Sequence, residues 1–253
     1  MKFSCHLKLI FIGLILVILS GHAFAGPIGT QIPGVSLNLG PAAKGGDVST
    51  SLQILALLTV LSLAPAILML TTAFTRIIII LSFVRTALGT PTIPPNQVLI
   101  GLSLFLTFFV MAPTYKLVDK NAIEPLIHHQ ISTQQAIDRA SGPMRTFMLH
   151  NTYEKDLSLF MNIRHEKADS PKDVSMVTLI PAFMISELKT SFIVGFYIFV
   201  PFVIIDLIVA STLMSMGMMM MPPTIISLPA KILVFVLANG WATVVAAIMA
   251  GYR

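Results

Sequence analysis

Four charged side chains stand in the most apolar stretch of the sequence, from Leu179 to Gly251: Glu187, Lys189, Asp206 and Lys231. Because a charge at the centre of a bilayer costs about 2.5 to 3.5 kcal/mol on insertion scales, each should face a protein partner or a wet cavity. Glu187 and Lys189 lie about 200° apart on a helix, so they need separate partners, and we predict Lys231 as the partner of Glu187. We expect these charges to bridge neighbouring subunits of a ring; extension of their heads to the lipid headgroups is the alternative.

A run of methionines lies in the same stretch and ends at a pair of prolines. It consists of Met218, Met219, Met220 and Met221, followed by Pro222 and Pro223. Methionine commonly fills gaps in apolar helices, which is the ordinary interpretation of such a run. At a helix end, however, flexible uncharged thioethers can project together, and repeated around a ring they would form a compliant hydrophobic seal. The run therefore also predicts a gasket that closes a passage against ions.

The sequence offers little to catalysis or metal binding. Its histidines have no acids or cysteines at ligand spacing, and none lies in an apolar segment where a serine protease of the membrane would need it. Asp206 has no second intramembrane aspartate, which excludes an aspartyl protease, and there is no Gly-rich phosphate loop. We therefore expect no enzymatic activity, no metal and no cofactor. A proton relay through Asp206 and Glu187, as in an ion-coupled secondary transporter, is the alternative function.

Composition sets the class of protein. Hydrophobic residues make up 55% of the chain and charged residues only 11%, whereas soluble domains have about a quarter of their residues charged. An integral membrane protein is therefore predicted, in contact with lipid. The net charge of +5 does not indicate nucleic acid, because the basic residues are scattered and are not interleaved with aromatic side chains.

The first residues have the pattern of a secretory leader. Lys2 and Lys8 precede an apolar core, and Ala23 and Ala25 form a small-residue cleavage site, so we predict a signal peptide over residues 1–25. Residues 26–50 are rich in Gly, Pro and Ser and predict a flexible periplasmic tail. The only cysteine lies in the leader, which leaves the mature chain without thiol chemistry.

The rest of the chain divides into three parts. Residues 51–113 predict a first helical hairpin, residues 114–176 a small helical periplasmic domain, and residues 177–253 a second hairpin that carries the methionine run. In the first hairpin the apolar segments are 52–72, 74–89 and 97–111, and Pro113 should stop the last of them. In the second, the segment 190–221 is longer than the roughly 20 residues of a straight span. Because it contains Pro201, we predict a broken or re-entrant path, with further breaks at Pro222 and Pro223.

A final helix is predicted over residues 228–251, where Ala238, Ala242, Ala246 and Ala250 recur every fourth residue as a stripe for close helix packing. In the first hairpin, Arg76 and Arg85 have no acid nearby in the sequence, which by the positive-inside tendency places their connection in the cytoplasm. The predicted fold is an all-α integral membrane protein of kinked helical hairpins with a small periplasmic domain, assembled into a ring-like oligomer.

Long segments of the chain resemble one family of proteins. Residues 181–206 (PAFMISELKTSFIVGFYIFVPFVIID) are similar to the signature segment of the FliP family, the flagellar type III export-gate proteins. The likeness continues through residues 207–241 and 75–113, and through MRTFML at 144–149. The leader and the exported tail favour the flagellar branch over the virulence branch. Departures are Met221, Ala230 and Asn239, where the family pattern has Leu, Phe and often Asp.

The resemblance implies a pentameric gate built from this chain with FliQ and FliR, working with FlhA and FlhB at the centre of the basal body, in the bacterial inner membrane. It implies that unfolded flagellar subunits pass through, that Met218 to Met221 form a gasket, and that Arg145, Glu187 and Lys231 are inter-subunit charges. We extend this set to Lys189 and Asp206. Besides the transporter, a purely structural anchor of the basal body is an alternative.

Overall fold

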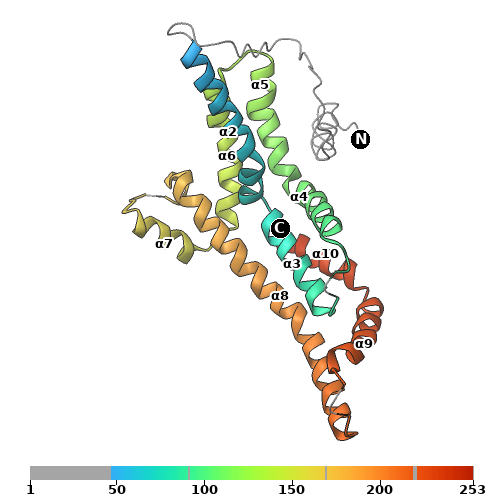
Figure 1. The fold of residues 1–253 in the computed structure, drawn as a ribbon. Helices are drawn as coiled ribbons and strands as arrows, with labels where there is room; N and C mark the ends of the chain where they lie inside the picture. The colour runs from blue at the N-terminus through green and yellow to red at the C-terminus, as the bar shows by residue number, and fades with distance from the viewer. Residues whose placement is uncertain (1–46, 91, 169, 219–220, 253) are drawn as a thin grey trace, which may run out of the picture. The chain divides into compact units, whose positions relative to one another are not determined.

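The computed structural model describes residues 47–90, 92–168, 170–218 and 221–252. The predicted signal peptide with Ala23 and Ala25, most of the predicted tail, and Met219 and Met220 lie outside the described residues. Every regular element in the described residues is a helix (Figure 1). The elements are α2 (Asp47–Thr71), α3 (Phe74–Ala87), α4 (Asn96–Val118), η1 (Asp119–Ile123), α5 (Glu124–Ile127), α6 (Thr133–His150), α7 (Glu154–Ile163), η2 (Pro171–Asp173), α8 (Met176–Ser215), α9 (Pro223–Leu237) and α10 (Gly240–Ala250).

The all-α membrane fold is confirmed by the length and composition of these helices. Among the described residues two helical runs are long and apolar enough to cross a membrane: Asn96–Ile127, which comprises α4, η1 and α5, and Met176–Ser215, which is α8. Two bent pairs also qualify if each pair counts as one span: the end of α2 with α3, bent by 79°, and α9 with α10, bent by 62°. Apolar runs of this length form helices in lipid because a helix satisfies its own backbone hydrogen bonds.

Helix α8 runs for 40 residues through both Pro181 and Pro201, so the predicted break at Pro201 is wrong. A proline removes one backbone donor, but membrane helices tolerate this where neighbouring side chains and helices support the freed carbonyl. Phe202, directly after the proline, is buried against α9, where its ring lies 6.3 Å from that of Phe235. Packing on both sides of Pro201 therefore keeps the helix continuous. Pro113 likewise fails to end α4, which continues to Val118 with Met111 and Thr114 buried on either side of it.

Gly217 ends α8, at a point before the methionine run. Its φ of 74° is in the left-handed region, and its N–H donates to the Met214 carbonyl while the Met218 N–H donates to the Leu213 carbonyl. This is the Schellman arrangement, in which glycine is favoured because it has no Cβ to clash. Pro222 and Pro223 then begin α9, where a proline at the first helical position loses no hydrogen bond.

The predicted final helix over 228–251 is wrong, because two helices occupy that range. Asn239 adopts a left-handed conformation with φ 50°, which ends α9 and starts α10 at an angle of 62°. Gly240 follows, and a Cβ there would lie within 3.0 Å of three ring atoms of Phe235. The alanine stripe is interrupted at this bend: Ala238 ends α9, and Ala242 and Ala250 are exposed on α10.

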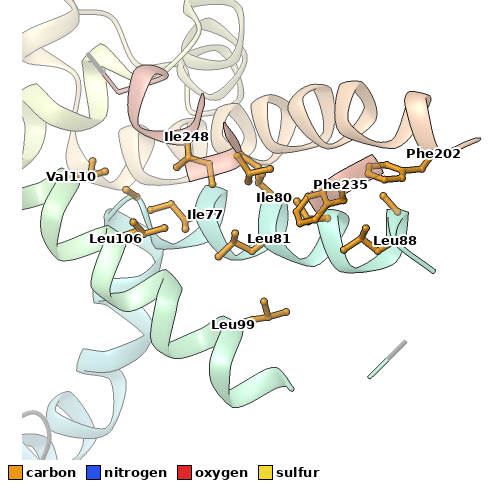
Figure 2. Packing of buried hydrophobic residues seen from close by; sticks show 14 residues of the cluster. Ile77, Ile80, Leu81, Leu88, Leu99, Leu106, Val110, Phe202, Phe235 and Ile248 are labelled. Atoms are coloured by element: carbon orange, nitrogen blue, oxygen red, sulfur yellow. The ribbon is translucent and has the colours of Figure 1, made fainter. Parts of the chain in front are cut away.

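Helix α3 lies at the centre of the larger hydrophobic core. Ile77, Ile80 and Leu81 are fully buried among side chains from α4, α8, α9 and α10 (Figure 2). A second cluster joins the predicted periplasmic domain to the start of α8; its members are Met148, Leu157, Val174, Leu179, Ala182 and Phe183. The two clusters share Phe147 as a neighbour, so α6 packs beside both. Helix α8 carries residues of both clusters and connects them along its length.

Candidate functional site

A buried ion pair joins α3 to α8. Arg76 is 5% exposed and Glu187 is not exposed at all. The guanidinium approaches the carboxylate with two parallel donors: Nε donates to Oε2 over 2.8 Å, and Nη2 donates to Oε1. Such a fork is the strong form of an Arg–carboxylate contact, because both oxygens and two nitrogens are satisfied together. The pair neutralises two charges that would otherwise be prohibitively costly in an apolar interior.

Gly251 and Tyr252, which follow α10, complete this cluster. The remaining guanidinium nitrogen of Arg76, Nη1, donates to the Gly251 carbonyl over 3.1 Å. The Tyr252 hydroxyl donates to Glu187 Oε2 over 2.7 Å, and the Tyr252 ring covers the guanidinium with its centroid 4.0 Å from Cζ. Four residues from three parts of the chain therefore share one charge-neutral, hydrogen-bonded cluster.

A second ion pair joins α8 to α9. Lys231 Nζ donates to Asp206 Oδ2 over 2.6 Å, and the hydroxyl of Ser227, one turn before Lys231, donates to Oδ1 of the same carboxylate. Lys231 and Ser227 are buried, and the Asp206 side chain is 28% exposed. Gly89 lies beside this pair, because a Cβ on it would be 3.9 Å from Lys231 Nζ. The turn that holds the methionines is thus braced by hydrogen bonds between its two flanking helices.

The structure therefore pairs the intramembrane charges differently from the sequence prediction. Within the described residues Glu187 binds Arg76, and Lys231 binds Asp206, so the predicted pairing of Glu187 with Lys231 is not formed in the chain. Sequence reasoning missed Arg76 as a site residue. Its signal was present, because Arg76 and Glu187 were each a charge in an apolar run without a local partner.

Arg145 and Lys189 also contact their own chain. Arg145, on α6, donates through Nη1 to the Val174 carbonyl and, over 3.2 Å, to the Lys172 carbonyl, just before α8 begins. Lys189 is exposed on α8 and its ammonium lies 4.8 Å from the centre of the Tyr153 ring. Arg145 thus holds the entry to α8, whereas Lys189 covers an aromatic ring at the start of α7.

The described methionines around the end of α8 are exposed. Met214 and Met216 are 65% and 67% exposed, and Met218 and Met221, which flank the two undescribed positions of the run, are 39% and 45% exposed. Their side chains make no part of either hydrophobic core. An exposed apolar group of this kind indicates contact with something outside the single chain.

Comparison with known proteins decides the family. A family model described as the FliP family matches residues 57–248, which include both buried ion pairs and the methionine run. The chain belongs to the FliP family. It is 54% identical over 217 residues to the flagellar biosynthetic protein FliP of Bacillus subtilis, covering 85% of this chain and 98% of that protein.

Other FliP proteins are similar over comparable lengths. That of Pectobacterium carotovorum is 52% identical over 224 residues, covering 87% of this chain and 86% of that protein. That of Aquifex aeolicus is 45% identical over 242 residues, covering 94% of this chain and 98% of that protein. As a member of the FliP family the chain is a flagellar export component, not an enzyme.

The described buried charges of this FliP-family chain are paired within it. In the part of the chain that the structure describes, no three His, Cys, Asp or Glu residues gather as a metal site would require. The ionised groups of the two clusters are bound to each other, and no buried side-chain nitrogen or oxygen of the described residues lacks a hydrogen-bond partner. The charges hold helices in place.

Proposed function

We propose that this chain is a core subunit of the flagellar type III export gate, which it forms with FliQ and FliR as a channel for unfolded flagellar subunits. The gate lies in the bacterial inner membrane at the centre of the basal body, and flagellum assembly depends on it. Five copies of the chain surround a common passage, next to FlhA and FlhB. The support for this proposal is the family, the membrane helices and the construction of the α8–α9 turn.

The observation that carries the proposal is a methionine turn held between two braced helices. Met218 and Met221 are exposed, and the contacts from Asp206 to Lys231 and Ser227 tie together the two helices on either side of the run. A rigid base under flexible side chains suits a seal, because the thioethers can adjust to a passing chain while the helices keep their positions. In the ring, the exposed thioethers of each copy face the central passage.

The charges predicted at subunit boundaries differ in their exposure and in their partners within the chain. Lys189 is exposed and Asp206 is 28% exposed, so both can meet a neighbouring copy directly, and Lys231 accompanies Asp206. Glu187 and Arg145 are engaged with their own chain. They act at the boundary by fixing where α8 presents its surface to the next subunit.

Alanine substitution of the methionines tests the gate. The variant replaces Met218 to Met221 with Ala in cells that make the whole export apparatus, and the measurements are passive ion leak and secretion of flagellar subunits. We expect a larger ion leak with altered secretion, because alanine cannot fill the passage. Met69→Ala is the control, since Met69 on α2 is 39% exposed, as Met218 is. Unchanged leak and secretion in the fourfold variant would favour a structural anchor instead.

Asp206→Asn separates the gate from an ion-coupled transporter. In a transporter with Asp206 in a proton relay, the neutral variant assembles normally but loses coupled transport. In the gate, the variant weakens the brace to Lys231, so we expect fewer assembled complexes or a leak. Particle images of the purified complex, with the copies around the axis counted, measure assembly independently of transport and also test the pentamer.

A further inference from the structure

Tyr252 stands where three packing elements of the chain meet. Its hydroxyl donates to Glu187 on α8 and lies 3.4 Å from the Ala73 carbonyl oxygen at the start of α3. Its ring covers the guanidinium of Arg76 and stacks on Phe147 of α6, with centroids 6.1 Å apart and planes inclined by only 18°. One side chain thus contacts the buried ion pair through its polar end and a neighbouring helix through its ring.

The cluster around Tyr252 sits at the ends of both bent helix pairs. Arg76 is in the first turn of α3, directly after the 79° bend that follows α2. Gly251 and Tyr252 directly follow α10, which leaves α9 at 62°. The Gly251 carbonyl and the Tyr252 hydroxyl are bound to Arg76 and Glu187, respectively. The ion pair therefore holds the far end of α10 against the first turn of α3.

We infer that Tyr252 is a positioning residue that locks α10 onto the Arg76–Glu187 pair and thereby sets the angle between α10 and α9. Without this contact α10 keeps the apolar packing of Val244 and Ile248 and the hydrogen bond from Arg76 to the Gly251 carbonyl, but it loses its link to Glu187 on α8. Because α9 begins directly after the methionine run, the angle also determines where the run is held. That last consequence rests on the proposed gate function; the lock itself does not.

Two substitutions separate the roles of hydroxyl and ring. Tyr252→Phe removes the hydrogen bond to Glu187 and keeps the ring over Arg76, and Tyr252→Leu removes both. Tyr197→Phe is the matched control, since Tyr197 on α8 is 71% exposed and its hydroxyl has no hydrogen bond among those of the described residues. All variants are made in the full chain and purified with the companions that co-assemble with it.

The main measurement is backbone hydrogen exchange over residues 240–252. We expect exchange there to rise by about tenfold in Tyr252→Leu and by less in Tyr252→Phe, while peptides from the middle of α8 keep their parent rates, because local opening raises exchange only where contacts are lost. Trp241, the only tryptophan of the chain, reports the same element through its fluorescence. Its emission should shift to longer wavelength in Tyr252→Leu and stay unchanged in Tyr197→Phe.

A coupling experiment distinguishes positioning from general packing. The double variant R76M and E187M removes both charges that Tyr252 contacts. Adding Tyr252→Phe to it should therefore have no further effect on hydrogen exchange at 240–252. Equal effects of Tyr252→Phe in both backgrounds would overturn the lock. Failure of the double variant to assemble does not remove the test. In that case hydrogen exchange at 240–252 is compared in Tyr252→Phe, Tyr252→Leu and Tyr197→Phe, and equal exchange in all three refutes the inference. Raised exchange with unchanged leak and secretion would keep the lock and reject its link to the gate.

Discussion

Lys231 reaches from α9 to Asp206 on α8, with its ammonium 2.6 Å from the carboxylate oxygen. The two residues lie 25 positions apart, on either side of the methionine turn. Ser227 binds the same carboxylate, so both of its oxygens are occupied from α9. The ion pair and the Ser227 hydrogen bond thus join the two helices that flank the methionine run.

Breaking this ion pair should destabilise the α8–α9 hairpin. Lys231→Met leaves Asp206 without its cation; removing one partner of a fully buried pair costs about 3 to 5 kcal/mol, and the partial exposure of Asp206 reduces this to about 1 to 3 kcal/mol. The measurement is the midpoint of thermal unfolding in detergent. The swapped pair D206K and K231D should recover part of the loss, whereas E187K with K231E should recover none, because Glu187 pairs with Arg76.

Neutralising Arg76 should destabilise the chain more than any other single change of charge. Arg76→Gln leaves the Glu187 carboxylate fully buried beside one remaining donor, Tyr252, and we expect a loss of about 3 to 5 kcal/mol. Arg85→Gln is the control on the same helix, because among the described residues the Arg85 guanidinium binds Asn96 and the Pro94 carbonyl and no acid. The yield of monodisperse protein after extraction, with the unfolding midpoint, checks the difference. Equal losses in the two variants would contradict the central role of the buried pair.

The residues that sequence reasoning placed correctly are those whose signal is local. Apolar runs located α2 and α3 to within a few residues. The proline pair was predicted only as a break, and α9 begins there, at Pro223, five residues before the predicted start at Leu228. The errors arose where packing overrides a local preference. Pro201 is a helix breaker by itself, but α8 continues through it because α3 and α9 pack along its length.

The partners of the charges could not be assigned locally. Arg76 and Glu187 are 111 positions apart, so only the tertiary fold brings them together. The nearness of Lys231 to the same apolar stretch favoured the wrong pairing, and Asp206 was the better-placed acid on the other arm of the hairpin. Likewise, the bend at Asn239 depends on one left-handed residue inside an apolar run, which hydropathy does not detect.

Acid should loosen the entry to α8, where Glu166 accepts hydrogen bonds from the first turn. The Thr178 hydroxyl, then the Ser175 N–H, lower the pKa of Glu166 from its usual value of 4.5. Because the carboxylate is favoured in the folded state, its contribution to stability is fully present above pH 4.5 and is lost as the pH falls through the lowered pKa of the folded chain. Glu166→Gln should remove this acid sensitivity, and Thr178→Val should move the loss to higher pH. Hydrogen exchange over residues 166–180, followed as the pH is lowered, measures the effect of both substitutions. Identical pH profiles in the parent and in Glu166→Gln would show that the Glu166 carboxylate does not stabilise the start of α8.

Gly195 sets how closely α8 approaches α3. A Cβ at this position would lie within 3.0 Å of three ring atoms of Phe83, whose ring is itself held edge-on against Phe192 with centroids 5.4 Å apart. Gly195→Ala therefore has to displace a ring between two packed helices, and we expect a loss of about 1 to 3 kcal/mol, as for other overpacked cores. Gly101→Ala is the control, because a Cβ there has nothing within 4 Å and alanine favours a helix by about 0.5 to 1 kcal/mol over glycine. The unfolding midpoint should fall in Gly195→Ala and stay level or rise in Gly101→Ala.

A second substitution tests whether the Phe83 ring is the cause. Phe83→Leu should relieve the clash and raise the unfolding midpoint of Gly195→Ala. If it lowers that midpoint instead, the absence of a side chain at Gly195 is not what makes room for the ring. A shift of α8 against α3 would also strain the Arg76–Glu187 fork, which lies about two helix turns away on each helix. Gly195→Ala should therefore weaken export even where the protein still folds.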